Sequence, residues 1–198
     1  MRSYLRILGI SVLSLMLVAS LRAQDENSVP APNVPKAIQV PGNPQEADFV
    51  GYATGTQNYT CNSTGHWPAS GHPEATLSDA NGVVFAHHFF TSGIVMGPTW
   101  QSLADGSFVI GSRVAGVPAP SCPATGFCAT IPWLLLSSIF NAGQGGGSTD
   151  QGGLFSSVSY IQRVNTSGGS APSGSCKPLQ TVSVPYTATY YFYNNQNQ

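Results

Sequence analysis

The clearest hydrophobic pattern of the chain lies near its C-terminus, in the segment TVSVPYTATYYFY (residues 181–193). Apolar or aromatic residues occupy every second position there: Val182, Val184, Tyr186, Ala188, Tyr190 and Phe192. This period of two predicts a long β-strand with one face against a core. Pro185 has no backbone N–H to offer a neighbouring strand, so we expect this strand to lie at a sheet edge or to carry a bulge.

Strand-like segments of the same kind recur at intervals of roughly ten residues along the chain. They are rich in Val, Ile, Thr and aromatic residues and cover residues 48–61, 74–79, 83–90, 98–102, 107–116, 132–140 and 154–165. The turns at Asn81-Gly82 and at residues 103–106 predict two hairpins. No segment from Pro35 to Gln198 shows a sustained helical period. The pattern therefore predicts an all-β single domain, either an antiparallel sandwich or a jelly-roll-like barrel.

The N-terminus has the organisation of a secretory signal peptide. Two arginines precede an apolar run from Ile7 to Val18, which is too short to span a bilayer, and Ala23 is a suitable cleavage residue. Five prolines follow within residues 25–45, and proline disfavours helix. We expect a signal peptide (1–23), a proline-rich flexible tether (24–37), a β-domain (38–194) and a disordered tail (195–198). The protein is then secreted or periplasmic.

Charge narrows the possible classes of function. Removal of residues 1–23 would take three of the seven basic residues and leave four against eight acidic ones, a net charge of −4. Nucleic-acid-binding proteins cluster lysine and arginine, and peripheral membrane proteins present a basic face. We therefore expect no nucleic-acid partner and no membrane insertion after signal cleavage.

The four cysteines predict two disulfides, since an even number of cysteines in an exported chain is typical of such bonds. Three pairings are possible. We favour Cys122–Cys128, because the intervening PATGF is rich in turn-forming residues, together with Cys61–Cys176, which would tie the start of the domain to its end. Their spacing matches no zinc knuckle or ribbon.

The adjacent histidines of GVVFAHHFF (residues 82–90) raise the question of a metal site. Neighbouring side chains of a strand point to opposite faces, so His87 and His88 cannot easily bind one ion. A metal site would need one of them with His66 or His72 from the preceding segment. The simpler expectation is a histidine whose ring nitrogen bonds a backbone carbonyl, and we expect no cofactor.

Aromatic residues are the candidates for ligand binding. Trp67 lies in the polar segment GHWPASGHP, and the outward face of the last strand would present Tyr191 and Tyr193. Such rings stack on sugars, so a glycan or another extracytoplasmic ligand is one expected partner. Arg163 is either a ligand anchor or a structural partner of an acid such as Asp79 or Asp105.

Catalytic motifs are absent from the sequence. There is no G-x-S-x-G nucleophile elbow, and the glycine-rich segment at residues 143–153 lacks the lysine of a phosphate-binding loop. We expect a non-catalytic binding or surface module. The alternatives are a metal-dependent hydrolase that uses His87 or His88 with His66 or His72, and a structural or stress-related secreted protein without a small ligand.

A series of motifs carries a resemblance to a known family. GTQNYTC, HFF with GPTW, DGS, VPAP, IPWLLL, YIQRVNTSGG and VPYTATYYFY occur in this order. The series resembles the bacterial and fungal DUF3455 family of exported proteins, from about Asp48 to Tyr193. The resemblance implies a secreted single domain and supplies no catalytic residues. The chain departs from the family pattern in a longer interval before GPTW and in the added pair Cys122 and Cys128.

Overall fold

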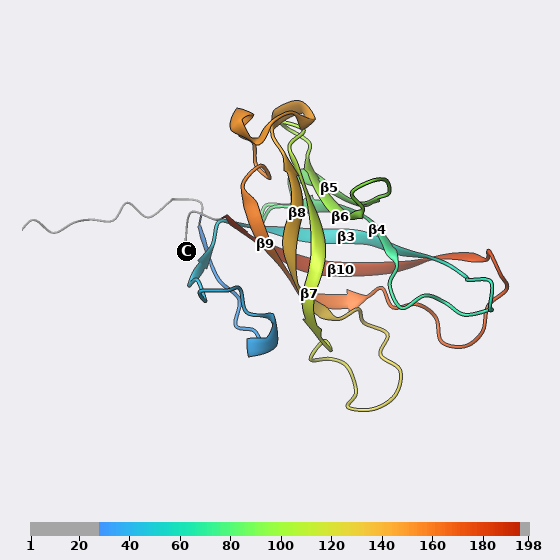
Figure 1. The fold of residues 1–198 in the computed structure, drawn as a ribbon. Coiled ribbons are helices and arrows are strands. Elements are labelled where there is room, and N and C mark those ends of the chain that lie inside the picture. The colour runs from blue at the N-terminus through green and yellow to red at the C-terminus, as the bar shows by residue number, and fades with distance from the viewer. Residues whose placement is uncertain (1–27, 195–198) are drawn as a thin grey trace, which may run out of the picture.

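The computed structural model describes residues 28–194, in which eight antiparallel strands close into a barrel (Figure 1). The strands are β3 (Phe49–Thr60), β4 (His72–Ser78), β5 (Val84–Thr91), β6 (Gly97–Ser102), β7 (Phe108–Val117), β8 (Trp133–Ala142), β9 (Val158–Gly168) and β10 (Thr181–Asn194). Each strand pairs with its neighbour in the chain, and β10 closes the barrel against β3. The predicted all-β, antiparallel, single-domain fold is confirmed; the barrel is the form it takes, with up-and-down connections. Within the described range no helix has the length and apolar content to cross a membrane.

The alternation of the last strand appears in β10 as expected. Tyr186, Ala188, Tyr190 and Phe192 are buried in the barrel core. Pro185 pairs with Thr56 of β3, whereas the pairing with β9 begins only at Tyr186, and a register shift follows between Thr187 and Thr189. The proline is tolerated because it lies where β10 has a neighbour on one side only.

One end of the barrel, which we call the closed end, is filled by the segment between β8 and β9 (residues 143–157), at the top of Figure 1. Phe155 from this segment is fully buried and packs edge-on against Phe49 (5.6 Å between centroids) and Phe192 (5.3 Å). The carboxylate of Asp105 accepts hydrogen bonds from Ser107 and from the backbone N–H of Leu154 (3.0 Å). These bonds hold the segment of residues 143–157, which we call the plug, in place.

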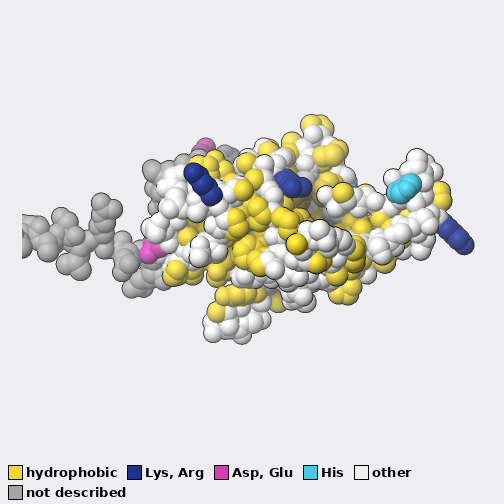
Figure 2. Space-filling model, turned by 90° about the horizontal axis from the view of Figure 1, so that it is seen from below, with side chains coloured by type: hydrophobic (Ala, Val, Ile, Leu, Met, Phe, Trp, Pro, Cys, Tyr) yellow, Lys and Arg dark blue, Asp and Glu magenta, His cyan; other side chains and the backbone are white. Residues whose placement is uncertain are grey.

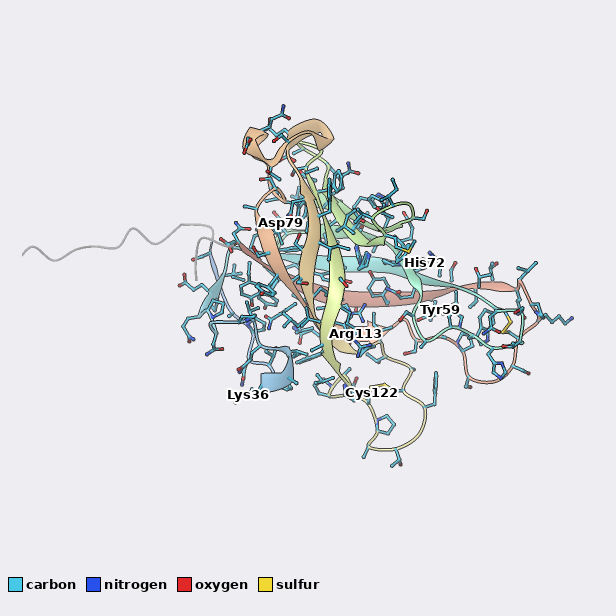
Figure 3. The ribbon with its side chains drawn as sticks, in the orientation of Figure 1. Lys36, Tyr59, His72, Asp79, Arg113 and Cys122 are labelled. Carbon is cyan, nitrogen blue, oxygen red and sulfur yellow. A yellow bond between two sulfur atoms is a disulfide. The ribbon has the colours of Figure 1, made fainter. Side chains whose placement is uncertain are left out.

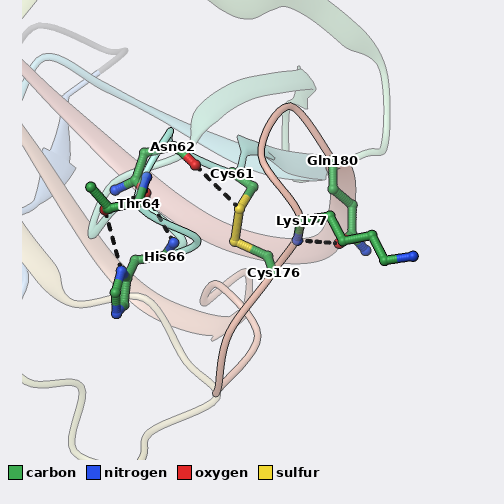
Figure 4. The surroundings of a disulfide bond; sticks show 7 residues. All are labelled: Cys61, Asn62, Thr64, His66, Cys176, Lys177 and Gln180. Carbon is green, nitrogen blue, oxygen red and sulfur yellow. Dashed lines mark hydrogen bonds between the residues drawn. A yellow bond between two sulfur atoms is a disulfide. The ribbon is translucent and has the colours of Figure 1, made fainter.

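The opposite end, which we call the open end, carries the loops 61–71, 92–96, 118–132 and 169–180. The longer three extend from the lower and right-hand sides of the barrel in Figure 1. A disulfide joins Cys61 to Cys176 and so links two of these loops (Figure 4), and a second joins Cys122 to Cys128 within a third. This is the pairing that the sequence analysis favoured. Two disulfides are typical of proteins from oxidising compartments.

The segment before the barrel packs against its outer surface. β1 (Val29–Pro30) pairs with β2 (Glu46–Ala47), and the short 3-10 helix η1 (Lys36–Ile38) lies between them. Ile38 is fully buried, and its carbonyl accepts a hydrogen bond from Gln162 Nε2 (2.7 Å). Residues 28–37, expected as a flexible tether, are therefore packed, because Val29, Ala31 and Val34 lie in an apolar cluster with residues of β7 to β10. The predicted signal peptide, residues 24–27 and the predicted tail lie outside the described residues.

Candidate functional site

The interior of the barrel holds a cavity of about 320 Å³ toward its open end. A large part of its wall is apolar: Phe90, Pro98, Trp100, Ile131, Leu134 and Leu136. Ala69, Ser70 and Gly71 of the loop between β3 and β4 also line it. Barrels of eight strands are just wide enough to be filled by side chains or to hold one small ligand. Here the closed end is filled and the rest of the interior keeps room for a ligand.

Polar side chains from five of the eight strands line the same cavity. They are Gln57, Tyr59, His88, Arg113, Arg163 and Tyr190. Alternation along the strands turns all of them except the exposed Arg113 inward, as it turns Ala86 and His88 of β5 away from His87. Figure 3 shows Tyr59 and Arg113 on the part of the barrel that faces the loop of Cys122, with Asp79 at the opposite end.

Among these polar residues, His88 is uncharged and is held in one orientation by its neighbours. It stacks on Trp100 (4.3 Å between centroids), and its Nδ1 lies 2.8 Å from the carbonyl oxygen of Thr99. Because a carbonyl only accepts, Nδ1 carries the proton and Nε2 accepts from the hydroxyl of Tyr190 (3.2 Å). Burial above all, with smaller contributions from Arg163 and His87, lowers the pKa of His88 to about 3 against the opposing effect of the Thr99 carbonyl. The ring is therefore uncharged at neutral pH.

The tyrosines of the cavity are also held in their neutral form. Burial raises the pKa values of the lining residues Tyr59 and Tyr190 and of Tyr186, which neighbours Tyr190, while the positive charge of Arg163 opposes this rise in all three. Tyr59 donates a hydrogen bond to the Gly169 carbonyl (2.6 Å). Arg163 is thus the charged group that lowers the pKa values of all three tyrosines.

Arg163 comes from β9 and lies between Leu134 of β8 and Tyr190 of β10 in the strand register. Its Nε and Nη2 donate to the carbonyl of Pro132 at 3.1 and 2.9 Å. The predicted partnership with Asp79 or Asp105 is wrong: Asp79 caps its own turn by accepting from Asn81 and Val83, and Asp105 belongs to the closed end. No acidic residue is among those that line the cavity in the described chain.

Two buried donors of the cavity residues form no hydrogen bond of normal geometry within residues 28–194: Gln57 Nε2 and Trp100 Nε1. Both residues line the cavity and are almost fully buried. The Gln57 side chain is close enough to the Tyr186 hydroxyl to lower its pKa. Buried polar groups in proteins are generally paired, so unpaired ones beside a cavity indicate the place of a ligand or of ordered water.

The structure separates the four histidines that were candidates for metal binding. His87 faces outward, with its Nε2 2.5 Å from Glu74 Oε1, and His88 faces inward. His72 stacks on Phe90 (4.0 Å), and His66 lies 3.3 Å from Thr64 Oγ1 near the Cys61–Cys176 bond (Figure 4). Over residues 28–194 no group of three His, Cys, Asp or Glu side chains is placed to hold a metal ion.

The aromatic residues expected to bind a ligand are also dispersed. Trp67 is half-buried in the loop between β3 and β4. Tyr193 is only 4% exposed, so its expected exposure is wrong: the N-terminal segment covers this face, and its hydroxyl donates to Gln162. Tyr191 is half-buried and packs beside it. Of the predicted binding residues, Arg163 alone lines the cavity.

Gln57, Tyr59, Trp100, Arg113 and Tyr190 are not predicted as site residues from the sequence. One signal was available. The mature chain has few basic residues, and a basic residue among apolar neighbours in a strand, as in YIQRVN, is unusual. Figure 2 shows how sparse charge is on one face, where single Lys or Arg side chains are separated by apolar and neutral polar surface.

Comparison with known proteins yields one match. The family model described as "Protein of unknown function (DUF3455)" matches residues 42–194, which include β2 and all eight barrel strands and leave out β1 and η1. Searches of curated proteins and of solved structures return no match. The family description carries no activity, so a function has to rest on the chemistry of the cavity.

Proposed function

We propose that this chain, which belongs to the DUF3455 family of proteins of unknown function, is an exported, non-catalytic binding protein that holds a small ligand inside its barrel. The observation that carries the proposal is the cavity itself. It is of a size typical of ligand pockets, and it has apolar walls with a few convergent polar groups. Its far side is sealed by Phe155, so a ligand would enter and leave at the open end.

The state of the polar groups supports binding rather than catalysis. A general base works best when its pKa lies near the operating pH. The imidazole that lines the cavity has a pKa of about 3, and burial raises the pKa values of Tyr59 and Tyr190. These groups position and recognise; they do not exchange protons readily at neutral pH.

Export is supported by two independent features. The sequence predicts a signal peptide over residues 1–23, and the described chain contains two disulfides, Cys61–Cys176 and Cys122–Cys128. Disulfides persist in oxidising compartments such as the periplasm and the extracellular space. N-terminal sequencing of the protein recovered from culture medium or periplasm tests this part of the proposal, with residue 24 expected as the first residue.

The binding function is tested with a neutral fluorescent probe, 1-aminonaphthalene. We expect its fluorescence to rise with the purified protein and to saturate at one probe per chain. Ala69→Trp places a large ring in the cavity mouth at an exposed position and should abolish the rise. Ala80→Trp, at an exposed position of the distant turn between β4 and β5, is the matched control and should leave binding intact. Equal binding by both variants would contradict a cavity site.

A further inference from the structure

We infer that the ligand is a small organic monocarboxylate whose carboxylate pairs with Arg163 and whose apolar body lies against Trp100 and Leu134. The inference rests on the proposed binding function and names the chemical class of its ligand. It follows from the charge of the cavity, from its excess of hydrogen-bond donors, and from its size and apolar walls.

Among the described residues, half of the lysines and arginines line this one cavity. Residues 28–194 contain four basic side chains, and two of them, Arg113 and Arg163, line this cavity. The carboxylates described in that range lie elsewhere, as Glu74 beside His87 and Asp105 at the closed end illustrate. A guanidinium held beside apolar walls without an anionic partner is unfavourable. An anionic ligand would remove this cost.

The hydrogen-bond inventory points the same way. A guanidinium has five N–H donors, and Arg163 directs two of its nitrogens to the Pro132 carbonyl. The unpaired Gln57 Nε2 and Trp100 Nε1 are further donors. The hydroxyl proton of Tyr190 is committed to His88, and that of Tyr59 to Gly169. Arg163, Gln57 and Trp100 therefore offer donors to a ligand, and a carboxylate, with two oxygens that only accept, is their complement.

The position of the arginines limits the charge of the ligand. Arg163 is half-buried within the cavity, whereas Arg113 is exposed at its mouth. The Nη2 atom of Arg113 lies beside Gly116, 2.8 Å from the position that a Cβ would take there. One interior guanidinium balances one negative charge; a second charge deep in the cavity would be left without a partner. Arg113 instead attracts anions to the entrance.

The volume of the cavity and its apolar walls indicate the size and chemical character of the rest of the ligand. A water molecule takes about 30 Å³ in the liquid, so the cavity holds roughly ten non-hydrogen atoms. Trp100, Leu134 and Leu136 offer no polar group to this part of the ligand except the indole N–H. An apolar chain or ring of this size, with the carboxylate at one end, fills the space.

Isothermal titration calorimetry with four probes tests the inference. Phenylacetate and octanoate each combine one carboxylate with an apolar body; phenylacetamide is the neutral match of the first, and inorganic phosphate is an anion without a body. We expect at least one carboxylate to bind, phenylacetamide to bind about 30-fold more weakly than phenylacetate, since one charge-assisted pair is lost, and phosphate not to compete. Equal binding of phenylacetate and phenylacetamide, or displacement by phosphate, overturns the inference.

Substitutions test whether the preference for a carboxylate over a neutral ligand arises from Arg163. Arg163→Met should abolish the preference for phenylacetate over phenylacetamide while 1-aminonaphthalene still binds, which shows that the barrel has folded. Arg113→Gln, at an exposed position, should slow association several-fold and keep the preference. Lys36→Gln, outside the cavity on η1, is the charge-matched control and should change nothing. An unchanged preference in Arg163→Met overturns the inference.

The two proposals fail in different ways. Binding of neutral 1-aminonaphthalene that Ala69→Trp blocks, without binding of either carboxylate, would leave the cavity function standing and remove the monocarboxylate. Loss of all probe binding would remove both. If Arg163→Met does not fold, the comparison of phenylacetate with phenylacetamide in the unaltered protein decides alone.

Discussion

The two ends of the barrel hold their loops in place by different interactions. At the closed end Phe155 packs edge-on against the stacked rings of Phe49 and Phe192. The Asp105 carboxylate accepts from the backbone N–H of Leu154, and the Asn141 side chain donates to the Phe155 carbonyl. At the open end the loops are tied by the Cys61–Cys176 disulfide, and the interior keeps its cavity.

The difference shows how a small barrel combines stability with a binding site. Close packing stabilises an end only by filling it, because empty volume in a core costs free energy. A disulfide stabilises chiefly by restricting the unfolded chain and needs no filled interior. Covalent ties at the open end therefore leave room for polar groups such as Arg163 and His88 inside the barrel.

Loss of the plug should have the largest effect on stability. Phe155→Ala removes a fully buried ring, and a Phe-to-Ala change in a core typically costs about 4 kcal/mol of unfolding free energy. Urea denaturation measures the change. Phe127→Ala, at a position 56% exposed in the loop of the second disulfide, is the control and should cost less than about 0.5 kcal/mol. A loss below about 1 kcal/mol in Phe155→Ala would show that the closed end does not depend on packing.

Removal of the long disulfide should come next. The double variant Cys61→Ser, Cys176→Ser opens a loop with a sequence separation of 115 residues, and we expect a cost of about 3 kcal/mol. The matched variant Cys122→Ser, Cys128→Ser opens a separation of 6 and should cost about 2 kcal/mol at most on the chain-entropy model. Denaturation under identical non-reducing conditions compares them. A larger loss from the short bond would contradict an entropic role for the long one.

The pH dependence of stability should report on the buried His88. Its pKa is about 3 in the folded protein and about 6.5 in an unfolded chain, so between these values the unfolded state binds the additional proton. Its contribution to stability is complete above pH 6.5 and declines as the pH falls toward 3. Between pH 7.5 and pH 5 the loss should be about 2 kcal/mol. Urea titrations at both pH values measure it.

The control for this titration is His88→Phe, which keeps a ring against Trp100 and removes the titrating group. This variant should be less stable at pH 7.5, because the Thr99 carbonyl and the Tyr190 hydroxyl lose their partner. Its stability should nevertheless change little between pH 7.5 and pH 5. A variant that retains the full pH dependence would assign the effect to another group.

The smallest effect is expected from the carboxylate of the closed end. Burial acts to raise the pKa of Asp105, but hydrogen bonds from Ser107 and Leu154 outweigh it and lower the pKa. Asp105→Asn replaces one accepting oxygen by an amide and should cost about 1 kcal/mol at pH 7. Asp150→Asn, exposed in the segment between β8 and β9, should be neutral. Denaturation at pH 7 would contradict the capping role if both variants matched the unaltered protein.

The local pattern was sufficient for the strands and their faces. The alternation of β10 and the Asn81-Gly82 turn predict elements that the structure contains, with Gly82 at a φ of +81° as such a turn requires. The opposite orientations of His87 and His88 also followed from the two-residue period. The packing of Ile38 could not be predicted in this way, because five nearby prolines dominate the local pattern and the surface that Ile38 covers is formed by strands far along the chain, β7 to β10.

The class of fold, the faces of the strands, the disulfide candidates and the scarcity of charge can all be predicted from the amino-acid sequence, because they depend on residue type and short-range spacing. That Gln57, His88, Arg163 and Tyr190 share one cavity, and that Tyr193 does not face solvent, follows from the three-dimensional fold alone. Barrel closure pairs β3 with β10, so Tyr59 lies opposite Val182, far away in the chain. A local sequence pattern does not show which inward side chains come together across a closed sheet. The candidate site consists of side chains that are brought together in this way.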